Sequence, residues 1–245
     1  RSAAIEDRDR IAEVLRGAVA VIGSAARGGG AWTWAAAVIV EIAKEMGILT
    51  VGVVTRPFSH EGRRHQVAGA GIEELKKYVD SLIVIPNEKL LQVLGSDVTM
   101  RQAFRAADDV LRGAVAGIAE VITCPGFINV DFADVKNVMG QMGMAMMGSA
   151  VASGLDRSRI AAEEAVASPL LDDISLDGAR GVLVNISTAP GCLLLREYHE
   201  IMEIIRNYAH ADAEVKFGTA EVDGMSEDEI RVTFIATGLG GGKKP

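Results

Sequence analysis

Two aspartates, Asp131 and Asp134, lie three residues apart where a short helix is expected to begin, in the stretch NVDFAD (129–134). Residues at this spacing share one face of a helix, so both carboxylates point outward from the helix end. In the simpler interpretation, Asp131 caps the helix and Asp134 interacts with the positive end of the helix dipole. In the other, the two acids orient a water molecule or a metal ion. The spacing alone fits both.

A glycine triplet, Gly28, Gly29 and Gly30, lies between an expected strand and an expected helix. Glycine loops at this position cradle phosphate groups with backbone amides and the helix N-terminus. Two indoles follow, Trp32 and Trp34, and they are bulky where an anion would approach the backbone. The spacing is neither that of a Walker loop nor that of a dinucleotide fingerprint. The residues alone therefore favour an ordinary strand-to-helix loop.

Phe104 and Asp108 form a third candidate pair, four residues apart on one face of a long expected helix. Core packing explains Phe104, and a solvated helix face explains Asp108. Alternatively, the ring stacks on a planar ligand and the carboxylate accepts hydrogen bonds from its N–H groups. The four histidines have no metal-ligand spacing, so we predict no metal site built from them.

Composition narrows the classes of function. The 245 residues have room for one large domain or two modest ones. Acids outnumber bases by 33 to 25 and no basic stripe occurs, which argues against nucleic-acid binding. Cys124 and Cys192 form no disulfide framework, which suits a reducing cytoplasm. No apolar run reaches the length of a membrane span and no signal-peptide pattern occurs, so direct membrane insertion is not expected.

The elements that position these residues alternate between strand and helix in the first half of the chain. Apolar runs predict buried strands at 18–25, 48–55 and 81–85, and helical patterns cover 5–16, the segment from the glycine triplet to about 46, and 64–79. Strands separated by helices favour a parallel sheet with crossover helices on its faces. A short helix is expected at 87–94.

The longest helical pattern covers 99–122 and spans about 35 Å, which is enough to connect two domains. Beyond it, a mixed sheet with two helices is predicted, from helices at 157–167 and 195–210 and strands at 181–187, 214–222 and 229–237. The polar link 223–228 suits antiparallel pairing of the last two strands. The methionines between 139 and 147 are interpreted as adaptable core.

Six segments together resemble FtsZ, the bacterial tubulin-like cell-division GTPases. They are EMGILTV (45–51), VTRPF (54–58), IPNEKLL (85–91), NVDFAD (129–134), MMG (146–148) and GVLVN (181–185). The resemblance extends from about Glu6 to Gly240, and the order of the segments makes it specific. It implies an α/β fold of the tubulin type, with a truncated Rossmann-type parallel sheet joined by a long central helix to a C-terminal α+β domain.

The same resemblance implies domain boundaries. The nucleotide-binding domain covers 1–98 and is truncated, because the family's first strand and first phosphate loop would precede position 1. The central helix covers 99–123, the catalytic loop and short helix 124–138, the C-terminal domain 139–240, and a flexible tail 241–245.

The activity that the resemblance implies is GTP hydrolysis between subunits of a head-to-tail filament, in the cytoplasm at the division site. Asn129, Asp131 and Asp134 match the loop that enters the neighbouring subunit's nucleotide pocket, where the two acids position the attacking water. A carboxylate that arrives only on assembly makes hydrolysis conditional on polymerisation. The implied partners are other copies of the chain and other division proteins.

The resemblance also assigns residues to GTP or GDP, with Mg²⁺ accompanying the nucleotide. The phosphate side would be Gly28, Gly29, Gly30 and Thr33, the ribose-side acid Glu61, and the guanine side Phe104 and Asp108. The chain is one residue short after Glu61 relative to the family pattern, so the arginine expected there is either Arg64 or is lost at His65.

The chain departs from the family pattern in the glycine loop, where Ala31, Trp32 and Trp34 replace a threonine and two glycines, and Ala26 and Arg27 replace a glycine and an apolar residue. These departures leave a second hypothesis open. In it, the chain is a non-catalytic assembly or interaction module that no longer binds GTP.

Overall fold

The structure is a computed structural model, and it describes residues 8–18, 20–25, 30–58, 62–88, 99–124, 126–140, 143–167 and 179–239. The chain forms two compact units. The first contains residues 1–112 and 142–144, and the second contains residues 113–141 and 145–245. The division falls inside the longest helix, and the domain boundaries given above remain a prediction.

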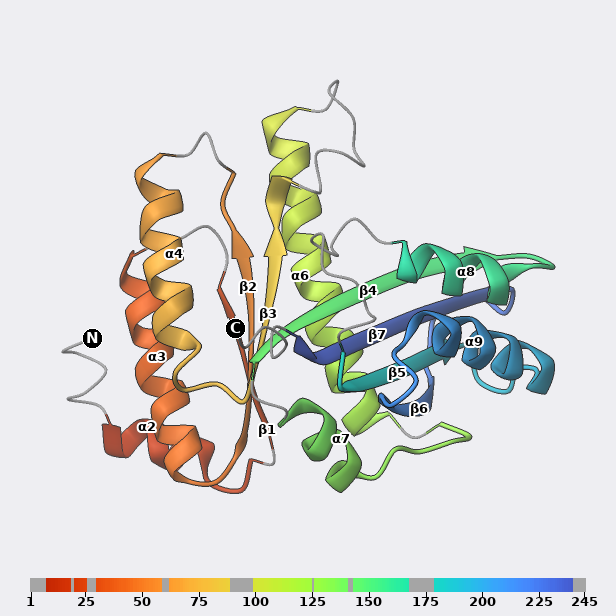
Figure 1. Cartoon of the computed structure of the whole chain (residues 1–245), viewed down its shortest axis with the longest axis horizontal. Coiled ribbons are helices and arrows are strands. Elements are labelled where there is room, and N and C mark those ends of the chain that lie inside the picture. The colour runs from red at the N-terminus through yellow and green to blue at the C-terminus, as the bar shows by residue number, and fades with distance from the viewer. Residues whose placement is uncertain are drawn as a thin grey trace. The chain divides into compact units, whose positions relative to one another are not determined.

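The first unit contains the predicted parallel sheet. Its strands β1 (Ala20–Ala25), β2 (Leu49–Arg56) and β3 (Ser81–Pro86) lie in that order, and each pairs with the next in parallel. The helices are α2 (Arg8–Leu15), α3 (Gly30–Glu45) and α4 (Arg63–Leu75), with α3 and α4 packed against each other and against the sheet (Figure 1). The alternation of apolar runs and helical patterns therefore predicted this unit correctly.

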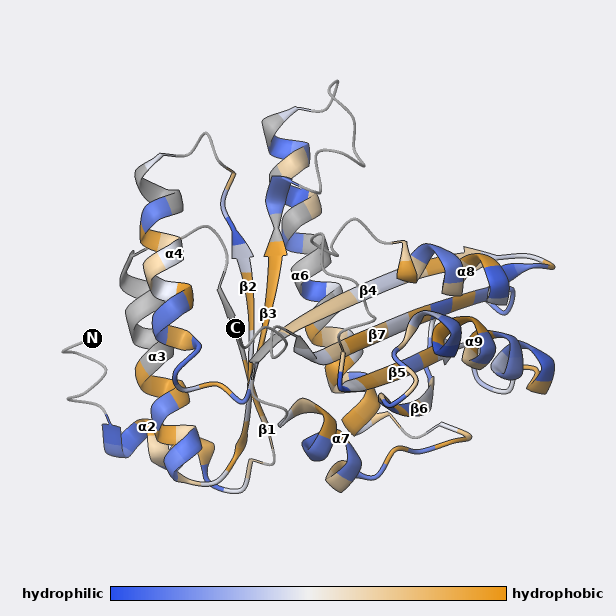
Figure 2. Cartoon of the chain, in the orientation of Figure 1, coloured by the Kyte–Doolittle hydropathy of each residue, from blue (hydrophilic) through white to orange (hydrophobic). Residues whose placement is uncertain are grey.

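Apolar side chains from both layers hold the first unit together. Helices α3 and α4 and strands β2 and β3 contribute to one buried cluster that includes Val40, Val54, Ile72, Leu75 and Leu82. Strand β3 is mostly orange in the hydropathy colouring of Figure 2. Gly52 leaves room for the side chain of Leu82, because a Cβ at position 52 would lie 2.8 Å from Leu82 Cδ1.

The second unit contains a mixed sheet. Its strand order is β4 (Gly143–Ser153), β7 (Glu229–Leu239), β5 (Gly181–Thr188), β6 (Glu214–Glu221). Strand β5 pairs in parallel with β6 and antiparallel with β7. Helices α8 (Arg157–Val166) and α9 (Leu195–Tyr208) pack on each other, and α8 also packs on β7 (Figure 1).

The predicted pairing of β6 with β7 is wrong, because β5 lies between them. All eight residues of β5 are buried, so the most apolar strand takes a central position and pairs along both edges. The link 222–228 is longer than a tight hairpin turn and can cross the roughly 10 Å between strands on either side of β5. Turn chemistry indicated the reversal of direction but not the intervening strand.

The longest helix, α6, runs over Met100–Thr123, as predicted. Its C-terminal half meets the second unit's sheet through polar groups: Glu120 accepts hydrogen bonds from Ser187 Oγ at 2.9 Å and from Arg231 Nη2 at 2.6 Å. Helix α7 (Phe132–Met139) follows.

The helix expected at 87–94 and the tail expected at 241–245 fall largely or wholly outside the described residues. None of the helices that the structure describes is both long and apolar enough to cross a membrane.

Candidate functional site

Residues 126–134, here called the acid loop, lie against the edge of β6 and lead into α7. Two hydrogen bonds of 2.8 Å join the loop to the strand, one from Ile128 N to Thr219 Oγ1 and one from Thr219 N to Ile128 O. Thr219 Oγ1 also donates a longer one to Ile128 O, at 3.4 Å. Thr219 is only 6% exposed and Ile128 is half-buried, so both short bonds are partly shielded from solvent. The backbone of the loop is therefore held to the sheet at Thr219.

Glycines on both sides make this contact possible. A Cβ on Gly126 would lie 1.9 Å from Thr219 O, and a Cβ on Gly218 would lie 2.7 Å from Val130 Cγ2. Only hydrogen atoms fit at these two points, so the loop and the strand approach more closely than side chains would allow.

The acids and the asparagine of the loop are held locally. Asn129 Oδ1 accepts a hydrogen bond from Gly126 N at 2.9 Å. Asp131 is the N-cap of α7, with extended backbone angles, and its side chain accepts from Ala133 N at 3.3 Å. The capping interpretation of Asp131 is thus confirmed. The residue is also exposed, so its carboxylate remains accessible.

Asp134 lies in the first turn of α7 and forms an ion pair with β6. Lys216 Nζ lies 3.1 Å from Asp134 Oδ1 and 3.4 Å from Glu214 Oε1. Hydrogen bonds to Asp134 and then to Glu214 raise the pKa of Lys216, so the ammonium stays charged. Helix α7 is anchored by the buried side chains of Val135, Val138 and Met139.

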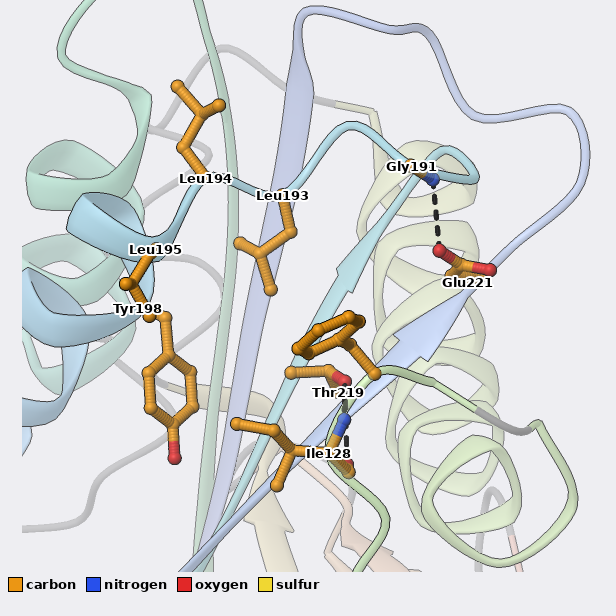
Figure 3. A pocket seen from close by; sticks show the side chains of 9 residues that line it. Ile128, Gly191, Leu193, Leu194, Leu195, Tyr198, Thr219 and Glu221 are labelled. Atoms are coloured by element: carbon orange, nitrogen blue, oxygen red, sulfur yellow. Dashed lines mark hydrogen bonds between the residues drawn. The ribbon is translucent and has the colours of Figure 1, made fainter.

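Beside the loop is a largely apolar cavity of about 370 Å³. Phe127 and Ile128 of the acid loop form one wall, and Leu193 and Tyr198 lie across from them. Figure 3 shows Ile128 and Leu193 directed toward the same space, with hydrogen bonds joining Ile128 to Thr219 and Gly191 to Glu221. The cavity lies entirely within the second unit.

A buried ion pair fixes the wall opposite the loop. Arg157 Nε donates to Glu197 Oε1 at 2.7 Å and Arg157 Nη2 donates to Glu197 Oε2 at 3.0 Å. The same guanidinium donates to the carbonyls of Cys192 and Glu227, and Glu197 accepts from Leu194 N. Burial alone would raise the pKa of Glu197, but hydrogen bonds from Arg157 and Leu194 outweigh it, and the pKa lies below its usual value.

The residues predicted for the nucleotide belong to the first unit. Gly28, Gly29 and Glu61 lie outside the described residues. The backbone of the remaining candidates is described: Gly30 and Thr33 in the first turn of α3, Arg64 in the first turn of α4, and Phe104 and Asp108 in α6. Their meeting around a ligand remains a prediction.

Sequence reasoning missed the residues that hold the acid loop, namely Lys216, Gly218 and Thr219 of β6. The one signal available was Gly218, because a glycine inside a strand often marks close approach of another backbone. Nothing in the local pattern pointed from β6 to a loop about 90 residues earlier in the chain, as the separation of 91 between Ile128 and Thr219 illustrates.

Comparison with known proteins identifies the class of protein to which the chain belongs. Residues 1–95 match the GTPase domain of the Tubulin/FtsZ family, and residues 143–240 match the C-terminal domain of the FtsZ family. A mutant FtsZ from M. jannaschii superposes with a TM-score of 0.90 at 38% identity, over 97% of this chain and 71% of that one. The expected tubulin-like α/β fold is therefore confirmed.

The chain belongs to the FtsZ family. The cell division protein FtsZ of Neisseria gonorrhoeae is 62% identical over 240 residues, which are 98% of this chain and 61% of that protein. An empty FtsZ dimer from M. jannaschii has a TM-score of 0.90 at 38% identity, over 97% of this chain and 68% of that one. The chain thus spans about three fifths of the length of the curated relatives that it matches.

Proposed function

We propose that this chain is part of a cell-division GTPase of the FtsZ type, which assembles head to tail and hydrolyses GTP where two subunits meet. The supporting observation is the acid loop itself, which presents accessible carboxylates from a rigidly anchored segment of the second unit. All the nucleotide candidates lie in the first unit. A filament would bring the second unit of one subunit against the first unit of the next.

In the proposed reaction, Asp131 and Asp134 position a water molecule against the γ-phosphate of the GTP bound by the neighbour. The water oxygen forms a bond to phosphorus as the bond to the β,γ-bridging oxygen breaks. The water proton passes to a carboxylate or to a phosphate oxygen, and GDP and phosphate leave. A positioning group must come within about 3 Å of the water, which a carboxylate on a fixed helix start can do once the neighbour docks.

Guanine nucleotide is the proposed ligand, and Mg²⁺ would accompany its phosphates. Within the described ranges, no three His, Cys, Asp or Glu side chains lie close enough to hold a metal ion, so we assign none of them to Mg²⁺. The proposed partners are other copies of the chain, supported by the dimer of the M. jannaschii relative, and other division proteins. The proposed location is the cytoplasm at the division site.

The test is whether this chain stimulates GTP hydrolysis by a second, intact FtsZ subunit. Intact FtsZ of Neisseria gonorrhoeae is held below its own assembly concentration with GTP, this chain is added, and phosphate release is measured. We expect release to rise with added chain and Asp134→Asn to abolish the rise. If the chain binds the intact protein without raising phosphate release, the proposed function is wrong.

A further inference from the structure

We propose that Lys216 and Thr219 of β6 are positioning residues for hydrolysis, with Thr219 fixing the backbone of the acid loop and Lys216 fixing the carboxylate of Asp134. This inference rests on the proposed function, because it assigns the two residues a task in the same site. Neither residue lies in the loop, and both reach it from a strand far along the chain.

Thr219 is suited to this task because it uses both its backbone and its side chain. Its amide donates to Ile128 O at 2.8 Å, and its hydroxyl accepts from Ile128 N at 2.8 Å. A valine at this position has the same shape but no oxygen, so Ile128 N would lose its partner in a partly buried place. A serine keeps the oxygen. The hydroxyl and the shape of Thr219 can therefore be tested separately.

Lys216 lies on the same face of β6 as Gly218, two residues further along the strand, where Val130 of the loop packs. Its ammonium reaches Asp134 Oδ1 at 3.1 Å, while the other oxygen of that carboxylate has no partner among the described residues. One oxygen is thus held by the lysine and the other is free to accept from water. Glu214 lies 3.4 Å from the same ammonium and forms a second ion pair with it.

The exposure of this ion pair argues that its task is orientation. Lys216 is 33% exposed and Asp134 is 36% exposed. Ion pairs with this degree of exposure contribute little to folding stability because solvent screens them. A carboxylate that aims a water molecule, in contrast, loses much of its effect when it is free to rotate. We therefore expect loss of Lys216 to affect turnover and not stability.

The experiment uses the stimulation assay with four variants of this chain: Lys216→Met, Lys216→Arg, Thr219→Val and Thr219→Ser. We expect Lys216→Met to lower the maximal stimulated turnover by about tenfold, while the chain concentration giving half the effect changes less than about twofold. Lys216→Arg should restore most of the turnover, since arginine also pairs with a carboxylate. Thr219→Val should lower turnover, and Thr219→Ser should retain it.

Lys136→Met is the matched control. Lys136 is exposed on α7, two residues from Asp134, and its replacement removes the same charge near the loop. An equal loss in both lysine variants would overturn the assignment of Lys216, because a general charge effect would then explain it. Full turnover in Lys216→Met would also overturn it. A wild-type chain that binds without stimulating would instead refute the proposed function, so the two failures are distinguishable.

Discussion

The buried pair of Arg157 and Glu197 yields a quantitative prediction. These side chains are only 7% and 5% exposed, and the guanidinium joins α8 to α9 and to the carbonyls of Cys192 and Glu227. Replacing Arg157 by methionine leaves a buried carboxylate that, among the described residues, keeps only the amide of Leu194 as a hydrogen-bond partner. Breaking such a pair by removing one member costs about 3–5 kcal/mol, and we expect Arg157→Met to destabilise the second unit by that amount.

Arg159 supplies the matched control, two residues along the same helix. It is 45% exposed and lies 3.0 Å from Glu163 and 3.7 Å from Asp156. Arg159→Met is the same substitution with the same change of charge, yet a surface pair contributes only about 0.2–1 kcal/mol. The difference between the two variants therefore isolates the effect of burial.

Urea denaturation followed by far-ultraviolet circular dichroism measures both variants. Hydrogen exchange of the amides in α8, α9 and β7 then locates the loss in the second unit. A cost of Arg157→Met within about 1 kcal/mol of that of Arg159→Met would refute the reasoning, since the pair would then behave as a solvent-exposed one.

Two further predictions concern pH and the acid loop. The pKa of Glu197 is lowered from its ordinary value of 4.5. The stabilising contribution of Glu197 is therefore present above pH 4.5 and is lost as the pH falls through the folded-state pKa. We expect the urea midpoint to fall on acidification, and to fall less steeply in Glu197→Gln. Gly126→Ala puts a Cβ within 1.9 Å of Thr219 O, so the loop must leave β6 and lose its two short hydrogen bonds to Thr219. We expect this loss to destabilise the chain by about 2 kcal/mol in total. The variant should also lose its stimulation of GTP turnover. Gly113→Ala, in α6 with nothing within 4 Å of the new Cβ, should instead stabilise by up to about 1 kcal/mol. A Gly126→Ala chain with full stability and stimulation would show that the loop does not need this contact.

Local sequence patterns predicted the positions of helices and strands along the chain better than the contacts between them. The parallel pairing of β1, β2 and β3 was predicted from apolar runs separated by helices, whereas the order of the strands comes from the structure. Strand β4 was not assigned, because Ala, Gly and Ser are weak strand formers and only burial reveals the strand. Gly148 shows how closely β4 is packed, since a Cβ there would lie 2.2 Å from Ala165 O and 2.5 Å from a ring carbon of Phe234.

In the acid loop, too, features that depend on neighbouring residues were predictable, whereas contacts with a distant strand were not. The cap at Asp131 was predictable, because it depends on residues within one helical turn. The ion pair between Asp134 and Lys216 and the anchor at Thr219 were not predictable, because they depend on how β6 lies in the sheet. The resemblance to FtsZ predicts a role for the acids, which stays a prediction, and it gave no indication of the strand that holds them.

Asp131→Asn provides the most direct test of catalysis by the acid pair in trans. Asparagine caps a helix about as well as aspartate, so the variant should keep the fold of α7 and its binding to intact FtsZ while losing the negative charge. We expect its maximal stimulation of GTP turnover to fall by about a hundredfold, with unchanged thermal stability and unchanged binding. Full stimulation by Asp131→Asn would show that Asp131 acts only as a helix cap, and would contradict its assignment as a catalytic acid.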